Sequence, residues 1–180
     1  TNLPFKPGYF DVVTSWEVME HILDPSIAIG QISTIIKDNG IFFMSTPNLN
    51  SKGRILKNEN WYGYQDPTHI SLAYPSTWIS LLTQGQFEIV ESFSSGFFDT
   101  PYFRYIPSLL QHLFIKIPFI LLFYLGLKLP LIGEGLFIVS TKKPTHRLSF
   151  WLFSTTKMRF PNKFSVSALL LLTRISHEIY

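Results

Sequence analysis

The architecture of the chain follows from residues 10–16, Phe-Asp-Val-Val-Thr-Ser-Trp, a short segment with a nearly continuous apolar start. Such a segment predicts a β-strand that is buried on both faces. Residues 41–46, Ile-Phe-Phe-Met-Ser-Thr, repeat the pattern and stop at Pro47. The distance between the two segments leaves room for one helix. The pattern therefore predicts a strand–helix–strand unit with parallel strands and a right-handed crossover.

The intervening helix is marked at both of its ends. Asp24 is suited to the N-cap position, and Pro25 to the first helical position, where its missing N–H costs nothing. Isoleucines then recur at helical spacing, and Asp38-Asn39-Gly40 supplies turn chemistry. We expect a helix over about 25–37.

Further elements follow along the chain. Pro75 and Gly85 bound a predicted helix over about 75–84. Residues 87–93 alternate between apolar and polar, as in a strand near a sheet edge, and 135–141 form the last strong strand signal. Residues 49–73 are polar, aromatic and irregular, and an irregular stretch of that length is more often functional than idle.

Composition limits the classes of protein that the chain can represent. Its 180 residues are 46% apolar and 15% charged, which suits one globular domain and excludes disorder as the main state. Cysteine is absent, which excludes disulfides, thiolate metal sites and a cysteine nucleophile. The first residue is Thr1, and we expect the chain to begin inside a longer one.

Charge is distributed unevenly. Residues 1–100 carry five Lys/Arg against ten Asp/Glu, a balance of −5, whereas 101–180 carry ten against two, a balance of +8. The basic residues stand singly among apolar ones and do not form a basic run. This pattern favours an anionic membrane over nucleic acid as the partner of the basic half.

The most apolar segment is 102–132. A bilayer-spanning helix needs roughly twenty apolar residues, but lysines and prolines at positions 116, 118, 128 and 130 interrupt this one. We therefore expect an interfacial hairpin or a hydrophobic lid. Residues 144–180 form a second basic and apolar stretch, a tail.

Three side chains that could bind a cation or transfer protons follow the first strand: Glu17, Glu20 and His21. If the chain turns helical there, they stand at i, i+3 and i+4 and share one face. Two carboxylates and an imidazole so placed could hold a divalent cation or transfer protons. The alternative is that Glu20 and His21 only orient the loop that leads into the helix at Asp24.

These residues complete a pattern that resembles a known family. The similarity is to class I S-adenosylmethionine-dependent methyltransferases, and in particular to the ubiquinone-biosynthesis O-methyltransferase-like branch. The residues that carry it are Phe10 to Val13, Glu17 to Ile22, Asp24-Pro25, Asn39-Gly40 and Ser45 to Asn48.

The resemblance implies an α/β fold, a Rossmann-like seven-stranded sheet of which this chain holds the C-terminal half. The four predicted strands would be strands 4, 5, 6 and 7, with the seventh antiparallel and inserted between the fifth and the sixth. Residues 1–143 would be the C-terminal part of the methyltransferase domain, with 102–132 as a hydrophobic helical insertion and 144–180 as the tail.

One family feature is missing from the printed sequence. The Gly-rich cofactor loop of the family has no counterpart, because no Gly-x-Gly-x-Gly occurs in the 180 residues. We expect this loop upstream of Thr1, and we expect this chain alone to be inactive.

The resemblance also assigns roles to residues. Trp16 would pack on bound S-adenosylmethionine, with Glu17 beside it, while Glu17, Glu20 and His21 match a group that some relatives use for Mg²⁺. Asp66 to His69 resemble a loop that closes over the acceptor. His69 would then be an exposed general base, acting with Glu20 and His21 as the catalytic group. The alternatives are a core Trp16 and a surface His69 without a role.

Two other sets of residues could contact an acceptor. Trp61, Tyr62 and Tyr64 could line an aromatic pocket, and Asn48, at the end of the second strand, could reach the substrate. The alternative for Asn48 is a turn residue.

The predicted function is S-adenosylmethionine-dependent methyl transfer to a hydroxyl of a small or lipid-like acceptor. The predicted location is the cytoplasm, with peripheral contact at the inner face of a membrane and no nucleic-acid partner. One alternative is a non-catalytic, membrane-peripheral module that retains half of the fold. A nucleotide-sugar or dinucleotide enzyme on a similar sheet has less support, since no phosphate-binding Gly loop is present.

Overall fold

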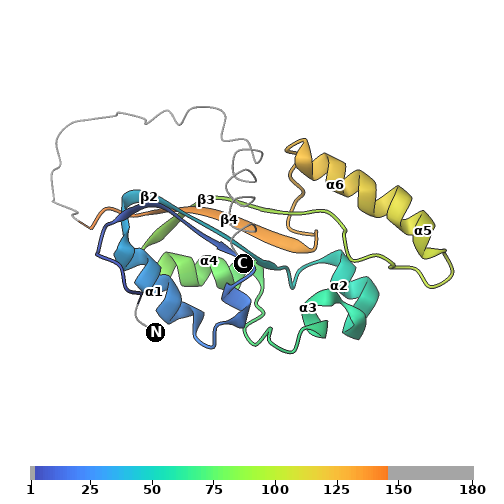
Figure 1. Ribbon diagram of the computed structural model, residues 1–180, viewed down its shortest axis with the longest axis horizontal. Helices are drawn as coiled ribbons and strands as arrows, with labels where there is room; N and C mark the ends of the chain where they lie inside the picture. Colours follow the sequence, from blue (N-terminus) through green and yellow to red (C-terminus); the bar gives the residue numbers. More distant parts are fainter. Residues whose placement is uncertain (1–2, 146–180) are drawn as a thin grey trace.

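A computed structural model describes residues 3–145 of the chain (Figure 1). The predicted tail therefore lies, from residue 146 onward, outside the described residues. The described strands are β1 (Phe10–Trp16), β2 (Ile36–Pro47), β3 (Phe87–Ser94) and β4 (Gly135–Lys142). They form one sheet in the order β1-β2-β4-β3.

The directions of the strands confirm the predicted topology. β1 and β2 are parallel, with Val12 opposite Ile41, whereas β4 runs antiparallel to both β2 and β3. The last strand is thus inserted between its two neighbours. Because β1 and β2 are parallel, their carboxyl ends meet at the same edge of the sheet.

The crossover helix α1 (Pro25–Ile35) begins where the sequence predicts it. The Asp24 carboxylate accepts hydrogen bonds from the backbone N–H groups of Ser26 and Ile27, at 3.0 and 3.3 Å. The helix ends two residues before the predicted end, since β2 starts at Ile36.

The predicted turn at 38–40 is present as an irregularity within β2. The pairing with β1 jumps from Phe10–Ile36 to Val12–Ile41, so the four residues 37–40 stand against the single residue Asp11. Asn39 has a positive φ of 62°. A Cβ atom on Gly40 would lie 2.7 Å from Ile36 Cγ1 and 2.8 Å from the Lys37 carbonyl oxygen, so the turn requires glycine at that position.

One face of the sheet holds the main core. Figure 1 shows α1 and α4 (Pro75–Gln84) side by side on that face. The buried side chains between helices and sheet include Ile29, Ile32, Phe42, Met44, Trp78, Leu82, Phe87, Leu136 and Ile138. Burial of each large aliphatic or aromatic side chain contributes roughly 1.5–3 kcal/mol of transfer free energy.

The other face carries a smaller aromatic cluster, Phe43, Phe93 and Phe137. Phe123 packs against this cluster, with its ring centroid 5.4 Å from that of Phe137. Phe123 belongs to α6 (Ile117–Tyr124), which continues α5 (Ser108–Gln111) and the π-helical turn η3 (His112–Lys116). One side of this helical segment therefore covers part of the sheet.

The opposite side of the same segment is apolar and exposed. We call it the outer apolar surface, and it consists of Leu109, Leu113, Phe114, Leu121, Tyr124 and Leu125. Among residues 3–145, no helix is both long enough and apolar enough to cross a membrane.

Two predictions about local structure are wrong. The first strand is not buried on both faces, because within the described residues β1 is an edge strand and leaves Val12 and Trp16 exposed. The stretch 49–73 is also more regular than predicted. It contains α2 (Lys52–Lys57), the 3-10 turn η2 (Asn58–Asn60) and α3 (Tyr62–Gln65). The Ser51 hydroxyl caps α2 by accepting the Arg54 N–H at 3.1 Å.

Candidate active site

The candidate site begins where β1 ends. Trp16 pairs with Ser45 of β2, and the next residue, Glu17, has a positive φ of 48°. The Glu17 N–H is held by the backbone oxygen and by the hydroxyl of Ser45, at 3.2 and 3.1 Å. The chain therefore turns sharply at Glu17.

This turn changes the predicted arrangement of the acidic cluster. Only one 3-10 turn follows, η1 (Met19–His21), and Glu17 precedes it. The helix on which Glu17, Glu20 and His21 would share a face is therefore not formed.

Glu20 occupies an unusual environment. Its side chain is 0% exposed, and neither of its carboxylate oxygens has a hydrogen-bond partner. Burial raises the pKa of Glu20 above its ordinary value. Burial and then the nearby charge of Glu20 raise the pKa of Glu17 to about 7. An unpartnered buried carboxylate costs free energy, so it points to a missing counter-ion or to a proton.

The loop 66–71 is fastened to the segment after β1. The Ser71 N–H donates to the Glu20 backbone oxygen at 2.9 Å, and the Ser71 hydroxyl donates to the Ile22 oxygen at 2.6 Å. As a result, the rings of His21 and His69 lie 4.7 Å apart between centroids. The prediction of an exposed His69 is wrong, because its side chain is 8% exposed and its Nδ1 bonds to the Gly63 oxygen at 2.8 Å.

Three side chains converge here: Glu20, His21 and His69. Each offers one donor atom, and these atoms all lie within 4.8 Å of one another. Among residues 3–145, no other group of three or more His, Asp or Glu side chains has its donor atoms this close together. Glu17 is not part of the group.

A cavity of about 360 Å³ opens at the end of β1, where Trp16 and Glu17 line it. Its residues come from the ends of β1 and β4 and from the segments after α2 and β3: Trp16, Glu17, Tyr62, Ser95, Phe98, Asp99, Glu134, Gly135 and Phe137. The Trp16 ring packs on Phe43 and Phe137, at centroid distances of 5.9 and 5.6 Å. Of the predicted site residues, Trp16 and Glu17 line this cavity. Glu20, His21 and His69 do not.

The three aromatic residues predicted to line an acceptor pocket, Trp61, Tyr62 and Tyr64, lie in different surroundings. Tyr62 lines the cavity and donates its hydroxyl to the Glu134 backbone oxygen at 3.1 Å. Burial, followed by the charge of Glu17, raises the pKa of Tyr62. Trp61 is fully buried, and Tyr64 lies at the surface beside Arg54.

Asn48 is a structural residue in this fold. It is fully buried, and its Nδ2 donates to the Gly133 oxygen at 2.7 Å and to the Leu131 oxygen at 3.3 Å. Its Oδ1 accepts the Asn50 N–H at 3.0 Å. The amide nitrogen therefore holds the segment that leads into β4, and the amide oxygen holds the turn that follows β2.

Glu134 is a buried acidic residue beside the cavity that was not predicted from the sequence. This residue is 1% exposed, and its Oε2 accepts the N–H groups of Phe98 and Asp99, both at 2.7 Å. Its Oε1 has no partner. The signal that could have found it is a single acidic residue between two glycines, directly before an apolar strand.

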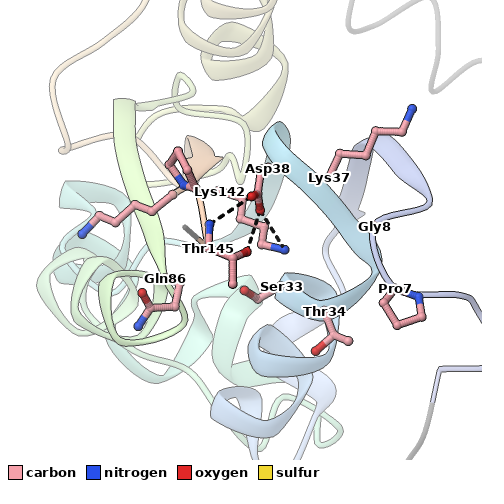
Figure 2. Close-up of a pocket in the computed structure, with 11 residues that line it drawn as sticks. Pro7, Gly8, Ser33, Thr34, Lys37, Asp38, Gln86, Lys142 and Thr145 are labelled. Atoms are coloured by element: carbon pink, nitrogen blue, oxygen red, sulfur yellow. Dashed lines mark hydrogen bonds and ion pairs between the residues drawn. The ribbon is translucent and has the colours of Figure 1, made fainter. Parts of the chain in front are cut away.

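A larger cavity, of about 850 Å³, lies at the other end of the sheet (Figure 2). Lys142 is 3.4 Å from Asp38, and Thr145 donates to the same carboxylate. Lys37 pairs with Asp11 at 2.8 Å. Ligands of open α/β sheets bind beyond the carboxyl ends of the parallel strands, which is the end at Trp16.

Fold and site together define an α/β domain with a crevice at the carboxyl ends of two parallel strands. Residues 1–92 match the family described as "Methyltransferase domain". The match extends over half of the chain, and the chain belongs to this methyltransferase family.

Individual relatives agree with this assignment. Fifty-one residues, 28% of this chain, are 46% identical to a ubiquinone biosynthesis O-methyltransferase of Colwellia psychrerythraea and cover 21% of it. The chain thus spans about a fifth of the length of the curated relatives it matches.

Solved structures show the same fold. A SAM-dependent methyltransferase of Thermotoga maritima, described as a possible histamine N-methyltransferase, has a TM-score of 0.55 at 18% identity, with 79% of this chain and 60% of that one covered. A putative methyltransferase of Haloferax volcanii, in complex with its Trm112 activator, has a TM-score of 0.53 at 16% identity, with coverage of 79% and 58%.

Proposed function

We propose that this chain takes part in S-adenosylmethionine-dependent methyl transfer to a hydroxyl of a small acceptor. The observation that carries the proposal is the position of Trp16, which ends β1 with its ring exposed beside the 360 Å³ cavity. A sulfonium held against an indole face gains about 0.5–2 kcal/mol of cation–π attraction. The family of the chain and the solved neighbour described as SAM-dependent support the same cofactor.

In this proposal the acceptor occupies the cavity between Trp16 and Tyr62. The Glu17 carboxylate would accept a hydrogen bond from the acceptor hydroxyl and take its proton as the hydroxyl oxygen bonds to the methyl carbon. The C–S bond would break in the same step, with its electron pair leaving on the sulfur as a neutral thioether. Methyl transfer is an in-line displacement, and positioning and exclusion of water supply most of the acceleration. Glu20, His21 and His69 do not line the cavity, and in this proposal they act on it through Glu17, whose pKa responds to the charges of Glu20 and His69.

Mg²⁺ on Glu17, Glu20 and His21 stays a prediction from the sequence, and the donor atoms that converge in the structure are those of Glu20, His21 and His69, without Glu17. Mg²⁺ also prefers an octahedron of oxygen ligands. No step of the proposed reaction therefore passes through Mg²⁺.

We also propose that the outer apolar surface contacts a membrane. Its side chains are exposed, whereas Phe119 and Phe123 on the other side of the helix pack against Phe97 and Phe137. The helix can thus act as a lid on the sheet with one side and meet lipid with the other. A lipid-like acceptor is compatible with this arrangement.

The division of the chain remains as proposed from the sequence, with 1–143 as the C-terminal part of a methyltransferase domain and 144–180 as a tail. Because the 180 residues contain no Gly-x-Gly-x-Gly, this chain alone is expected to bind the cofactor weakly. The rival function, a non-catalytic membrane-peripheral module, rests on the same missing motif.

Calorimetry with S-adenosylmethionine tests the proposal on two samples, the 180-residue chain and the protein translated from the longest reading frame that contains it. We expect weak binding by the first and micromolar binding by the second, and Trp16→Ala should weaken the latter about tenfold, or about 1.4 kcal/mol. Tyr9→Ala, an exposed aromatic at the other end of β1, serves as the control and should change nothing. Absence of binding by the longer protein would favour the non-catalytic module, and micromolar binding by the 180-residue chain would overturn the division of the domain.

A further inference from the structure

We propose that the 360 Å³ cavity at the end of β1 selects an acceptor that carries a positively charged ammonium group besides the hydroxyl that receives the methyl group. The same cavity would reject acceptors that carry a carboxylate or a phosphate. This acceptor class rests on the proposed function, because it names what the chain would methylate. The charges and the aromatic rings of the cavity wall carry it.

Negative charge is concentrated in the wall of the cavity. Three of its nine lining residues are acidic, Glu17, Asp99 and Glu134, and none of the nine is a lysine, an arginine or a histidine. Asp99 has a counter-ion, since its Oδ1 lies 2.6 Å from Lys57 Nζ. Within residues 3–145, Glu17 and Glu134 form no ion pair with a lysine or an arginine. Two carboxylates of the wall are therefore without a cation from the described part of the chain.

Glu134 gives an independent sign of a cationic ligand. It is 1% exposed, and its Oε1 has no hydrogen-bond partner. Gly53 of α2 leaves room for this oxygen, because a Cβ atom there would collide with it. Burial raises the pKa of the Glu134 carboxyl, which means that its ionised form is destabilised where it stands. A cation in the cavity would stabilise that form through its charge.

The charges of the carboxylates add up inside the cavity. Tyr62 lines it, and its hydroxyl donates to the Glu134 backbone oxygen at 3.1 Å. Burial raises the pKa of this hydroxyl most, and the charges of nearby carboxylates raise it further: Glu17, Glu134, Glu20 and Asp99. All of these charges therefore act in the same direction on a group in the cavity wall. A wall of one sign attracts ligands of the opposite charge.

Aromatic rings supply the second requirement for binding an ammonium group. The rings of the wall belong to Trp16, Tyr62, Phe98 and Phe137. Those of Trp16 and Phe137 lie 5.6 Å apart between centroids, and Trp16 stays 38% exposed. The face of an aromatic ring is negative and attracts cations, and several rings around one site are a common way to bind ammonium ligands. A carboxylate or a phosphate would be repelled by the ring faces and by the acidic side chains alike.

The charges also balance through the proposed reaction. Glu17 takes a proton as the sulfonium on Trp16 becomes a neutral thioether, so these two charges disappear together. The charge of Glu134 is not used by the transfer. An ammonium group on the acceptor would balance it both before and after the methyl group moves.

Three probes of similar size and different charge test the proposal: tyramine, 4-ethylphenol and 4-hydroxyphenylacetate. Each has one phenol hydroxyl, and at neutral pH their other ends are cationic, uncharged and anionic. NMR titration of the 180-residue chain measures the dissociation constants, and the shift of the Trp16 indole N–H shows that the probe lies at the cavity. We expect tyramine to bind at least about 10-fold more tightly than 4-ethylphenol, and 4-hydroxyphenylacetate to bind more weakly than both.

Glu134→Gln keeps an oxygen that can accept the N–H groups of Phe98 and Asp99 but removes the charge. It should lower the preference for tyramine over 4-ethylphenol about fivefold or more. Glu88→Gln removes an exposed charge on β3, is the matched control, and should leave the preference within about twofold. Circular dichroism checks folding. If Glu134→Gln does not fold, Trp16→Leu takes its place and should also lower the preference.

Equal binding of tyramine and 4-ethylphenol by the wild type would overturn the proposal, as would an unchanged preference in the folded variant. The calorimetry with S-adenosylmethionine tests the proposed function separately. If the longer protein binds S-adenosylmethionine and the probes bind without preference, the acceptor class is wrong and the proposed function stands.

Discussion

Lys57 Nζ lies 2.6 Å from Asp99 Oδ1, in an ion pair whose side chains are 13% and 20% exposed. The pair links the end of α2 to the segment that follows β3. Lys57 also donates to the Asp99 backbone oxygen at 2.8 Å, and the Asp99 carboxylate accepts the Tyr62 N–H at 2.9 Å. Two segments that line the candidate cavity are thereby held in place.

Lys57→Met should lower the free energy of unfolding by about 2–4 kcal/mol, because it leaves the Asp99 carboxylate largely buried and without its cation. Urea denaturation measures the change. Lys52→Met, at an exposed position on the same helix, is the control and should stay within about 0.5 kcal/mol. Equal effects of the two substitutions would show that the ion pair contributes nothing specific.

Asn48→Ala should destabilise the fold by about 2–4 kcal/mol. The substitution leaves the Gly133 carbonyl and the Asn50 N–H without partners in a largely buried place, and it removes one of the two bonds to the Leu131 oxygen. Asn50→Ala removes only an exposed bond to the Leu131 oxygen and should cost less than about 1 kcal/mol. If Asn48→Ala is as stable as the wild type and instead loses acceptor binding, the structural role assigned to Asn48 is wrong.

The stability of the protein should fall as the pH rises above 4.5, and Glu134 should account for part of this fall. Burial raises the pKa of its carboxyl above the ordinary value of 4.5. The folded state then keeps a proton that the unfolded state releases, so the stabilisation is complete below pH 4.5 and is lost as the pH rises through the raised pKa.

Glu134→Gln tests this expectation. Glutamine can still accept the N–H groups of Phe98 and Asp99, but it does not titrate. Urea midpoints at pH 4, 5.5 and 7 should decline less in the variant than in the wild type. Parallel declines would mean that Glu134 has the same pKa in both states.

The outer apolar surface should bind anionic vesicles. Each buried apolar side chain contributes roughly 1.5–3 kcal/mol, and each nearby basic residue about 1 kcal/mol, so flotation should be strongest at low salt. The variant Phe114→Gln/Leu125→Gln replaces side chains that are 71% and 77% exposed, and it should float less. Leu23→Gln, at a position 85% exposed in the loop between η1 and α1, is the control and should float like the wild type. If the wild type does not float at low salt, the proposed membrane contact is wrong, and the helical segment acts only as a lid on the sheet.

Local signals predicted the elements well. Asp24 and Pro25 start α1 through hydrogen bonds and a φ preference that involve only neighbouring residues. Gly85 ends α4, also through bonds to nearby residues of the same helix. The buried run at 41–46 and the alternation at 87–93 also became strands, because burial on two faces and on one face leave different patterns.

The site was less predictable, because its geometry depends on contacts between distant segments. His69 approaches His21 only because Ser71 bonds to the segment after β1. Glu17 is not in the predicted group because its φ angle is positive and the chain turns there. Helical spacing in the sequence does not reveal such a turn. The position of Glu134 beside Phe98 and Asp99 depends on the register of β4 in the sheet, which the sequence does not give.

The open side of β1 has a practical consequence for handling the protein. Within residues 3–145, β1 pairs only with β2, and its outer edge presents unsatisfied backbone groups beside exposed Val12. Such an edge is a template for strand addition between molecules. A preparation limited to 3–145 should therefore self-associate as its concentration increases, and light scattering would detect this. Val12→Lys, which places a charge on that edge, should delay the onset of aggregation and make samples for spectroscopy attainable.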